Sequence, residues 1–132
     1  MKIIILVSLL FFSCLISAQD INSYITQAGQ YESAMNDEQA IVKYKEALKI
    51  QPGNIFAMCK ASELCSRIGA RLKNNKAEQV DYFAAARTYA QTALKLEPLN
   101  SESNFVMALV IGREALNKGG KEKIMAVKDS KN

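Results

Sequence analysis

Several residue types on which enzymes and metal sites depend are absent or scarce in this sequence. Its 132 residues include no His and no Trp, which excludes Ser-His-Asp catalysis and zinc sites with His ligands. The three cysteines never fall in C-x-x-C spacing, so thioredoxin-like motifs are excluded as well. No glycine-rich loop for phosphate binding can be drawn from the six glycines. The sequence therefore predicts a protein that is not an enzyme and uses no cofactor and no metal.

One long apolar run is present, at the N-terminus. Lys2 is followed by IIILVSLLFFSCLISA, and Ala18 offers a small residue for cleavage, which together are typical of a secretory signal peptide. We expect residues 1–18 to be removed and residues 19–132 to be exported to the periplasm or secreted by a bacterium. Retention of the run as a membrane anchor stays open, although it is shorter than the ~20 residues of a spanning helix. Lipidation of Cys14 is a third alternative, but the preceding LFFS matches the lipoprotein pattern poorly.

The rest of the chain shows helical periodicity, with apolar or small residues recurring every three or four positions. No segment alternates apolar and polar residues as a half-buried strand would, so the predicted fold is all-α. The GG pair at 119–120 should end the fifth helix, and a sixth should begin after it. The predicted helices cover about 21–35, 37–51, 55–69, 80–97 and 101–116.

Two segments of the chain are nearly alike: ALKIQPGN at 47–54 and ALKLEPLN at 93–100. Such internal likeness indicates a repeat of helical hairpins. Three units result, at 21–54, 55–100 and a partial one at 101–132. The second unit is longer, and we expect its polar segment ARLKNNKAEQVD to form an extended loop between two helices. With Pro52 closing the first unit, the small and aromatic positions of the tetratricopeptide repeat are filled by Ala28, Tyr31, Ala40, Tyr44 and Ala47, while Gln27 departs from the pattern.

The long second unit and the segment GGKEKIMAVKDSKN give the chain a likeness to a particular subfamily. It resembles the regulator-of-microtubule-dynamics type of tetratricopeptide protein over most of residues 37–132. The resemblance implies a helical solenoid that continues for further repeats in a longer protein. It also implies work inside cells with microtubules and organelles, from which the signal peptide of this chain departs.

A solenoid of helical hairpins presents a concave face lined by the first helix of each unit. Phe56 and Phe105 on this face would serve as apolar anchors for a peptide, with Arg67 and Arg113 available for its carboxylates. The alternative is that both phenylalanines pack against neighbouring helices. Ile25 and Gly29 stand where a carboxylate clamp would need Lys and Asn, which disfavours a chaperone-tail ligand. The predicted groove positions are Asn22, Ile25, Glu32, Phe56, Cys59, Glu63, Arg67, Glu102, Phe105, Leu109 and Arg113.

The charges are unevenly distributed along the chain. Residues 19–40 carry four acids and no base, whereas residues 113–131 carry six bases against three acids. Ordinary solvated helix faces explain this distribution, and end-to-end self-association or a basic patch for anionic lipid or polymer are the alternatives. No nucleic acid is expected as a partner, because aromatic residues are not interleaved with the lysines. The oligomeric state stays open, and Cys59 and Cys65 are predicted to be buried free thiols.

These observations predict an exported, non-catalytic scaffold that binds a protein or peptide ligand in its concave groove. The alternative is a membrane-anchored lipoprotein or lipid-associated component of an envelope assembly complex. Membrane association requires that the leader is retained or that Cys14 is lipidated.

Overall fold

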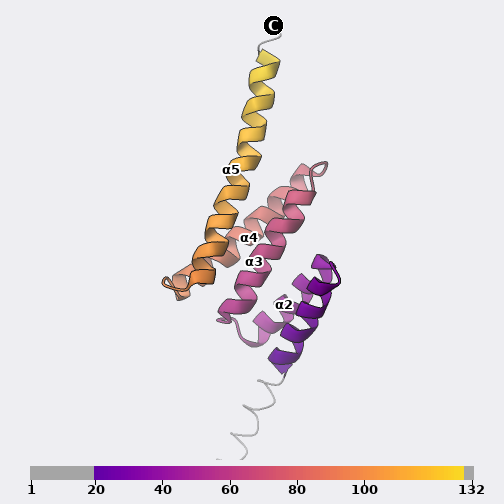
Figure 1. Cartoon of the computed structure of the whole chain (residues 1–132), viewed down its shortest axis with the longest axis vertical. Helices are drawn as coiled ribbons and strands as arrows, with labels where there is room; N and C mark the ends of the chain where they lie inside the picture. Colours follow the sequence, from indigo (N-terminus) through magenta and orange to yellow (C-terminus); the bar gives the residue numbers. More distant parts are fainter. Residues whose placement is uncertain (1–19, 130–132) are drawn as a thin grey trace, which may run out of the picture.

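The chain folds into a row of antiparallel helices, and the predicted all-α class is confirmed (Figure 1). The computed structural model describes residues 20–129, and the burial of side chains for residues 20–119. Residues 20–33 are helical and precede α2 (Asp37–Ile50), α3 (Ile55–Arg71), α4 (Lys76–Leu96) and α5 (Ser101–Asp129). None of the described helices is long and apolar enough to cross a membrane. The predicted signal peptide and Cys14 lie outside the described residues.

The first hairpin turns sharply at Met35 and Asn36. Met35 adopts a left-handed conformation with φ of 56°. Its N–H donates to the carbonyl of Glu32, and the N–H of Asn36 donates to that of Tyr31, at 3.0 and 2.9 Å. This pattern is a Schellman motif, which usually has glycine at the left-handed position. The Asn36 side chain then accepts from the N–H of Gln39 and caps α2.

Asparagine caps the other helices of the row as well. The side chains of Asn54 and Asn75 accept from backbone N–H groups in the first turns of α3 and α4. Asn100 does the same for α5, accepting from the N–H groups of residues 102 and 103. Each cap satisfies N–H groups that have no partner inside the helix.

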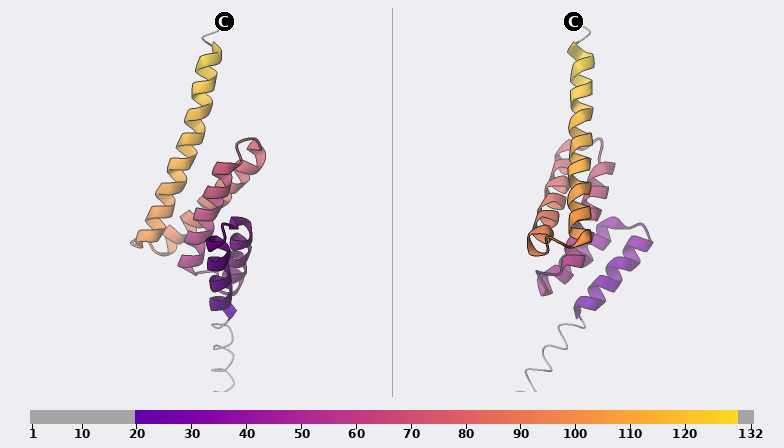
Figure 2. Two further views of the ribbon diagram at one scale, coloured as in Figure 1. Left: turned by 45° about the vertical axis from the view of Figure 1, so that its right-hand side comes forward. Right: turned by 60° about the vertical axis from the view of Figure 1, so that its left-hand side comes forward.

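Two predicted helix boundaries are wrong, both because a polar or glycine-containing segment stays helical. The extra residues of the second unit lengthen α3 and α4, and only residues 72–75 lie between the two helices. The α5 helix continues through Gly119 and Gly120 to Asp129, where a break and a sixth helix were predicted. A glycine inside a helix costs only about 1 kcal/mol relative to alanine, which is not enough to force a break. As a result α5 extends beyond the ends of α3 and α4 (Figures 1 and 2).

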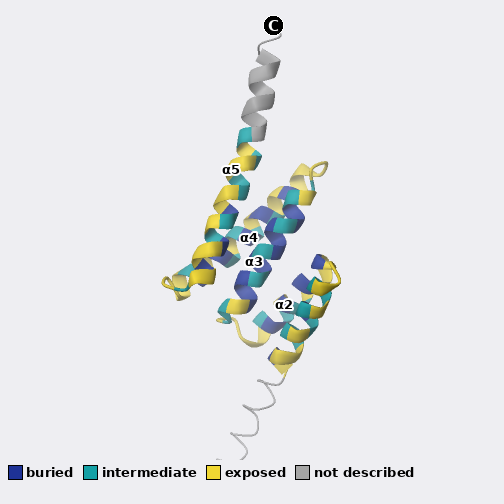
Figure 3. Cartoon of the chain, in the orientation of Figure 1, coloured by how far each residue is buried: buried dark blue, intermediate teal, exposed yellow. Residues whose placement is uncertain are grey.

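The hydrophobic core follows α3, which packs against α2, α4 and α5 and carries a nearly continuous buried surface (Figure 3). Small residues allow these helices to approach closely. Ser62 replaces alanine at one of these positions, and its hydroxyl donates to the carbonyl of Ala86 at 2.8 Å. The small positions of both units have no exposed surface: Ala28, Ala40, Ala47, Ser62, Ala86 and Ala93.

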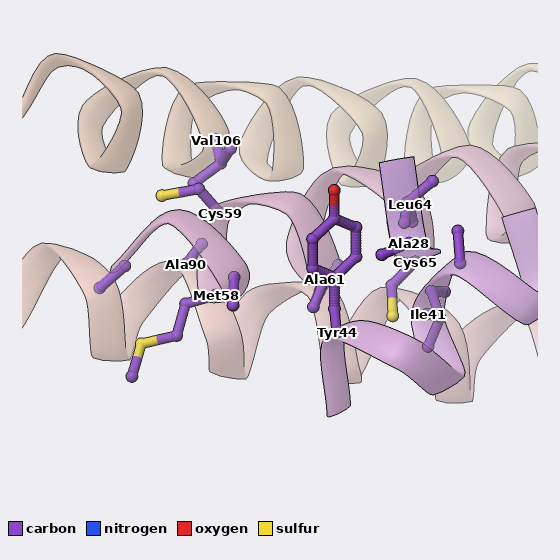
Figure 4. Close-up of a cluster of buried hydrophobic side chains, with 14 of the residues drawn as sticks. Ala28, Ile41, Tyr44, Met58, Cys59, Ala61, Leu64, Cys65, Ala90 and Val106 are labelled. Carbon is purple, nitrogen blue, oxygen red and sulfur yellow. The ribbon is translucent and has the colours of Figure 1, made fainter. Parts of the chain in front are cut away.

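The aromatic and sulfur-containing residues of the repeat fill the space between hairpins. Tyr44 is buried between the two units, as its position in the repeat predicts (Figure 4). Cys59 and Cys65 are buried free thiols, and this prediction is confirmed. Cys59 lies beside Ser103 of α5, with 4.0 Å between the sulfur and the hydroxyl oxygen. Its placement on the groove face was therefore wrong, since it seals the contact between α3 and α5.

Candidate functional site

The two phenylalanines predicted to anchor a ligand are on the surface. Phe56 in the first turn of α3 is 44% exposed, and Phe105 near the start of α5 is 60% exposed. Phe56 also contacts Tyr44 edge to face, with 6.2 Å between the ring centres. This contact orients the Phe56 ring while leaving nearly half of its surface in water. Both side chains therefore offer apolar surface at the first helices of adjacent units.

The other apolar groove positions are less accessible. Ile25, in the helix at 20–33, packs against the core and is only partly exposed. Leu109 is one turn after Phe105 on α5 and is half-buried. The apolar groove positions therefore differ in exposure, with two exposed rings and two partly buried aliphatic side chains.

The charged groove positions Glu63 and Arg67 belong to a network of ion pairs. Arg67 lies 3.4 Å from Glu63, 3.8 Å from Glu32 and 3.4 Å from Asp37, measured between side-chain nitrogen and oxygen atoms. Lys60 joins the same network, at 3.3 Å from Glu32. Arg67 therefore already has three carboxylate partners within the chain. A ligand carboxylate would have to compete with them.

A partly buried hydrogen bond lies at the centre of this network. The hydroxyl of Tyr44 donates to Glu32 at 2.6 Å, which is a short bond to a charged acceptor. Burial of the phenol, together with this bond and the Glu32 charge, raises the pKa of Tyr44. The Tyr44 hydroxyl is thus a fixed donor at neutral pH. It positions Glu32 toward Lys60 and Arg67 from the opposite helix.

Asp37 and Arg71 also belong to the network, and sequence reasoning missed both roles. The Asp37 side chain is only 2% exposed, although Asp37 is the first residue of α2. Arg71 reaches it at 2.7 Å from the end of α3, and Arg67 approaches from the preceding turn. The spacing of Arg67 and Arg71, four residues apart on one helix face, was the available signal.

Arg113, the last groove position, lies in a different environment. It is half-buried and lines a cleft of about 220 Å³ together with Lys73 and Lys76 from the α3–α4 turn. Among the residues that the structure describes, no carboxylate lies within ion-pair distance of Arg113. Arg113 thus lies in a cleft whose lining includes none of the other predicted groove residues.

Nothing in the described part of the chain resembles a metal site, because no three His, Cys, Asp or Glu side chains gather there. The two thiols are also unsuited to nucleophilic chemistry. Burial raises the pKa of Cys65 to about 11 and raises that of Cys59 above its usual value. A thiol with a raised pKa carries little thiolate at neutral pH. The two cysteines are therefore poor candidates for a nucleophile.

The ordered hairpins and the long second unit agree with a comparison against protein families. The model of the family described as regulator of microtubule dynamics protein 1-3 matches residues 24–132, which is most of the chain. No match is found among curated proteins. The matched segment contains all four labelled helices and every predicted groove residue except Asn22. The chain therefore belongs to the regulator of microtubule dynamics protein 1-3 family.

Proposed function

We propose that the protein is an exported, non-catalytic scaffold that binds a protein or peptide through the face formed by the first helices of its units. The observation that carries the proposal is the exposure of Phe56 and Phe105 on α3 and α5. Large exposed aromatic side chains are frequent anchors of protein interfaces. The charges around Phe56 are paired internally, so that binding there buries an apolar ring without leaving a charge unpaired.

Export rests on the N-terminal sequence. The Lys2 charge, the apolar run at 3–18 and the small residue Ala18 favour a cleaved leader and a mature protein in the bacterial periplasm or medium. The alternative is a chain held at the membrane by the retained leader or by a lipid on Cys14. The mass of the mature N-terminus distinguishes them, because cleavage would leave Gln19 first and lipidation would leave a modified Cys14.

The family description refers to microtubule dynamics. A protein exported from a bacterium would not meet microtubules, so we propose a partner among proteins of the cell envelope. The direct check is sedimentation of the purified chain with polymerised tubulin. Saturable co-sedimentation that depends on Phe56 and Phe105 would replace the envelope partner in this proposal with tubulin.

The proposed binding face is tested with a double variant, Phe56→Ala/Phe105→Ala. Wild type and variant are used to capture proteins from envelope extract, and captured proteins are quantified by mass spectrometry. Leu99→Ala/Leu96→Ala is the matched control, because both residues are exposed and apolar but lie outside the predicted groove. Helicity measured by circular dichroism must be equal in all three proteins.

We expect a protein captured by wild type and by the control, and lost with the Phe56→Ala/Phe105→Ala variant. Undiminished capture of the same protein by that variant would contradict the proposed face. Loss of capture by the control as well would show that exposed apolar surface in general causes the binding.

A further inference from the structure

A second surface, between the α3–α4 turn and α5, combines apolar residues with three cations. The cleft has a volume of about 220 Å³. Phe83, which is nearly buried, lies at its base with Ala70, and the exposed Leu116 of α5 lies beside them. The cations around this apolar base are Lys73, Lys76 and Arg113.

These three cations have no counterion within the described residues. The residues that line the cleft include no Asp and no Glu. The Lys76 ammonium donates to the side-chain oxygen of Gln79 at 3.1 Å, which is a neutral partner. Three like charges around one cleft raise its positive potential and favour an anionic ligand.

The apolar surface continues beyond the cleft along α4 and α5. An adjoining hollow of about 320 Å³ shares Phe83 and Asn117 with it and adds Val80 and Ala84. At this end Arg87 donates two hydrogen bonds to the carboxylate of Glu114, and Lys118 adds a further positive charge. The combined surface therefore carries a net positive charge and is apolar between its charged residues.

The size of the two hollows bears on the kind of ligand. Each is at or below the lower end of the roughly 300–1,000 Å³ range of pockets for drug-sized molecules. Each can instead hold one or two side chains of a peptide. A small inorganic anion would use the cations but leave Phe83, Val80 and Leu116 uncovered.

We propose that this surface, the basic cleft, binds an acidic peptide segment. Apolar side chains of the peptide pack on Phe83 and Leu116, and its carboxylates pair with Lys73, Lys76 and Arg113. The site is separate from Phe56 and Phe105, and the inference does not depend on the function proposed for them. Its ligand class, an acidic sequence with adjacent apolar residues, follows from the charge and the apolar base together.

The test is selection from a phage-displayed library of random 12-residue peptides on the full chain. Peptides selected by wild type should be enriched in Asp and Glu next to Leu, Ile or Phe. The variant Lys73→Gln/Arg113→Gln removes two of the cations, and Lys45→Gln/Lys95→Gln is a control with the same change in net charge on exposed residues elsewhere. The strongest selected peptide is then synthesised with a fluorescent label, and its Kd is measured by anisotropy.

We expect the Kd to rise about tenfold for Lys73→Gln/Arg113→Gln, as two partly exposed ion pairs would give, and to stay unchanged for the control. A second variant, Leu116→Gln, should weaken binding as well, and it can fold because Leu116 is largely exposed. Peptides without acidic enrichment, or equal weakening by both double variants, would overturn the proposal. Displacement of the peptide by inorganic phosphate at similar concentration would identify a simple anion site and also overturn it. Unchanged binding to Phe56→Ala/Phe105→Ala is expected, so that the failure of either site is recognised separately.

Discussion

The ion pairs of Asp37 with Arg67 and Arg71 lead to a prediction about stability. A variant that lacks all three charges should be more stable than a variant that lacks only the two arginines. The Asp37 side chain is almost entirely buried at the start of α2, and its only cationic partners in the described chain are these two arginines of α3. Neither carboxylate oxygen accepts a hydrogen bond of regular geometry from the described residues. The negative charge of Asp37 therefore depends on the arginines and on the positive end of the α2 dipole.

Removing the two arginines should cost more unfolding free energy than removing the Asp37 charge. Removing the arginines, as Arg67→Gln/Arg71→Gln, leaves the Asp37 charge buried without a partner, and such changes cost about 3–5 kcal/mol of unfolding free energy. Asp37→Asn leaves two arginines that are 38% and 52% exposed and can be hydrated. It loses the ion pairs and the interaction with the helix dipole, which together contribute about 1–2 kcal/mol.

The triple variant, Asp37→Asn/Arg67→Gln/Arg71→Gln, should accordingly be more stable than the double arginine variant by about 1–2 kcal/mol, because no buried charge remains unpaired. The loss of Arg67 contacts with Glu32 and Glu63 is common to both variants and cancels. Urea unfolding followed by circular dichroism at pH 7 gives the free energies. A triple variant that is less stable than the double variant would refute the reasoning.

Three further predictions concern separate parts of the chain. Met35→Gly should raise the unfolding free energy by about 0.5–1 kcal/mol in urea titrations, because Met35 has a φ of 56° and is 88% exposed, whereas Met35→Ala should give no gain. Cys59 and Cys65 should resist a chromogenic thiol reagent at pH 8 in the native protein and react with it in urea, because burial raises the pKa of both thiols. Reaction of the native protein at the rate of a free thiol would contradict their burial. Glu114→Gln should cost about 0.5–1 kcal/mol at pH 7, since Arg87 hydrogen bonds the carboxylate. The hydrogen bond from Arg87 lowers the pKa of Glu114. The contribution of this pair to the unfolding free energy is therefore fully present above the unfolded pKa of Glu114 and is lost as the pH falls through its lower folded pKa. A cost of Glu114→Gln that is the same at pH 7 and pH 3 would show that the ion pair does not cause it.

The fold was predictable because the repeat places small residues where helices cross. Ala28, Ala40 and Ala47 are fully buried as their positions in the unit require, and Tyr44 fills the space between hairpins. The lengths of the helices were not predictable in the same way. Residues 72–79 and 119–120 contain polar or glycine residues that local rules assign to loops, but the helices on either side continue through most of these positions. Packing on neighbouring helices outweighs such weak local preferences.

Only part of the candidate groove could be predicted from the sequence. Exposure of Phe56 and Phe105 followed from their place on the first helix of each unit. The partners of Arg67 did not follow, because Asp37 and Glu32 come from other helices and their approach depends on the angle between hairpins. The gathering of Lys73, Lys76 and Arg113 was not predicted for the same reason, since Lys73 and Arg113 are far apart in sequence and line one cleft only in the folded chain.

The most direct test of the proposed binding face is photo-crosslinking in living cells. A photoreactive phenylalanine analogue replaces Phe56, Phe105 or, as an exposed reference in the loop before α5, Leu99. We predict that positions 56 and 105 crosslink to the same protein partner and that position 99 does not. Crosslinking of that partner from position 99 alone, with none from 56 or 105, would contradict the assignment of the first-helix face as the binding surface.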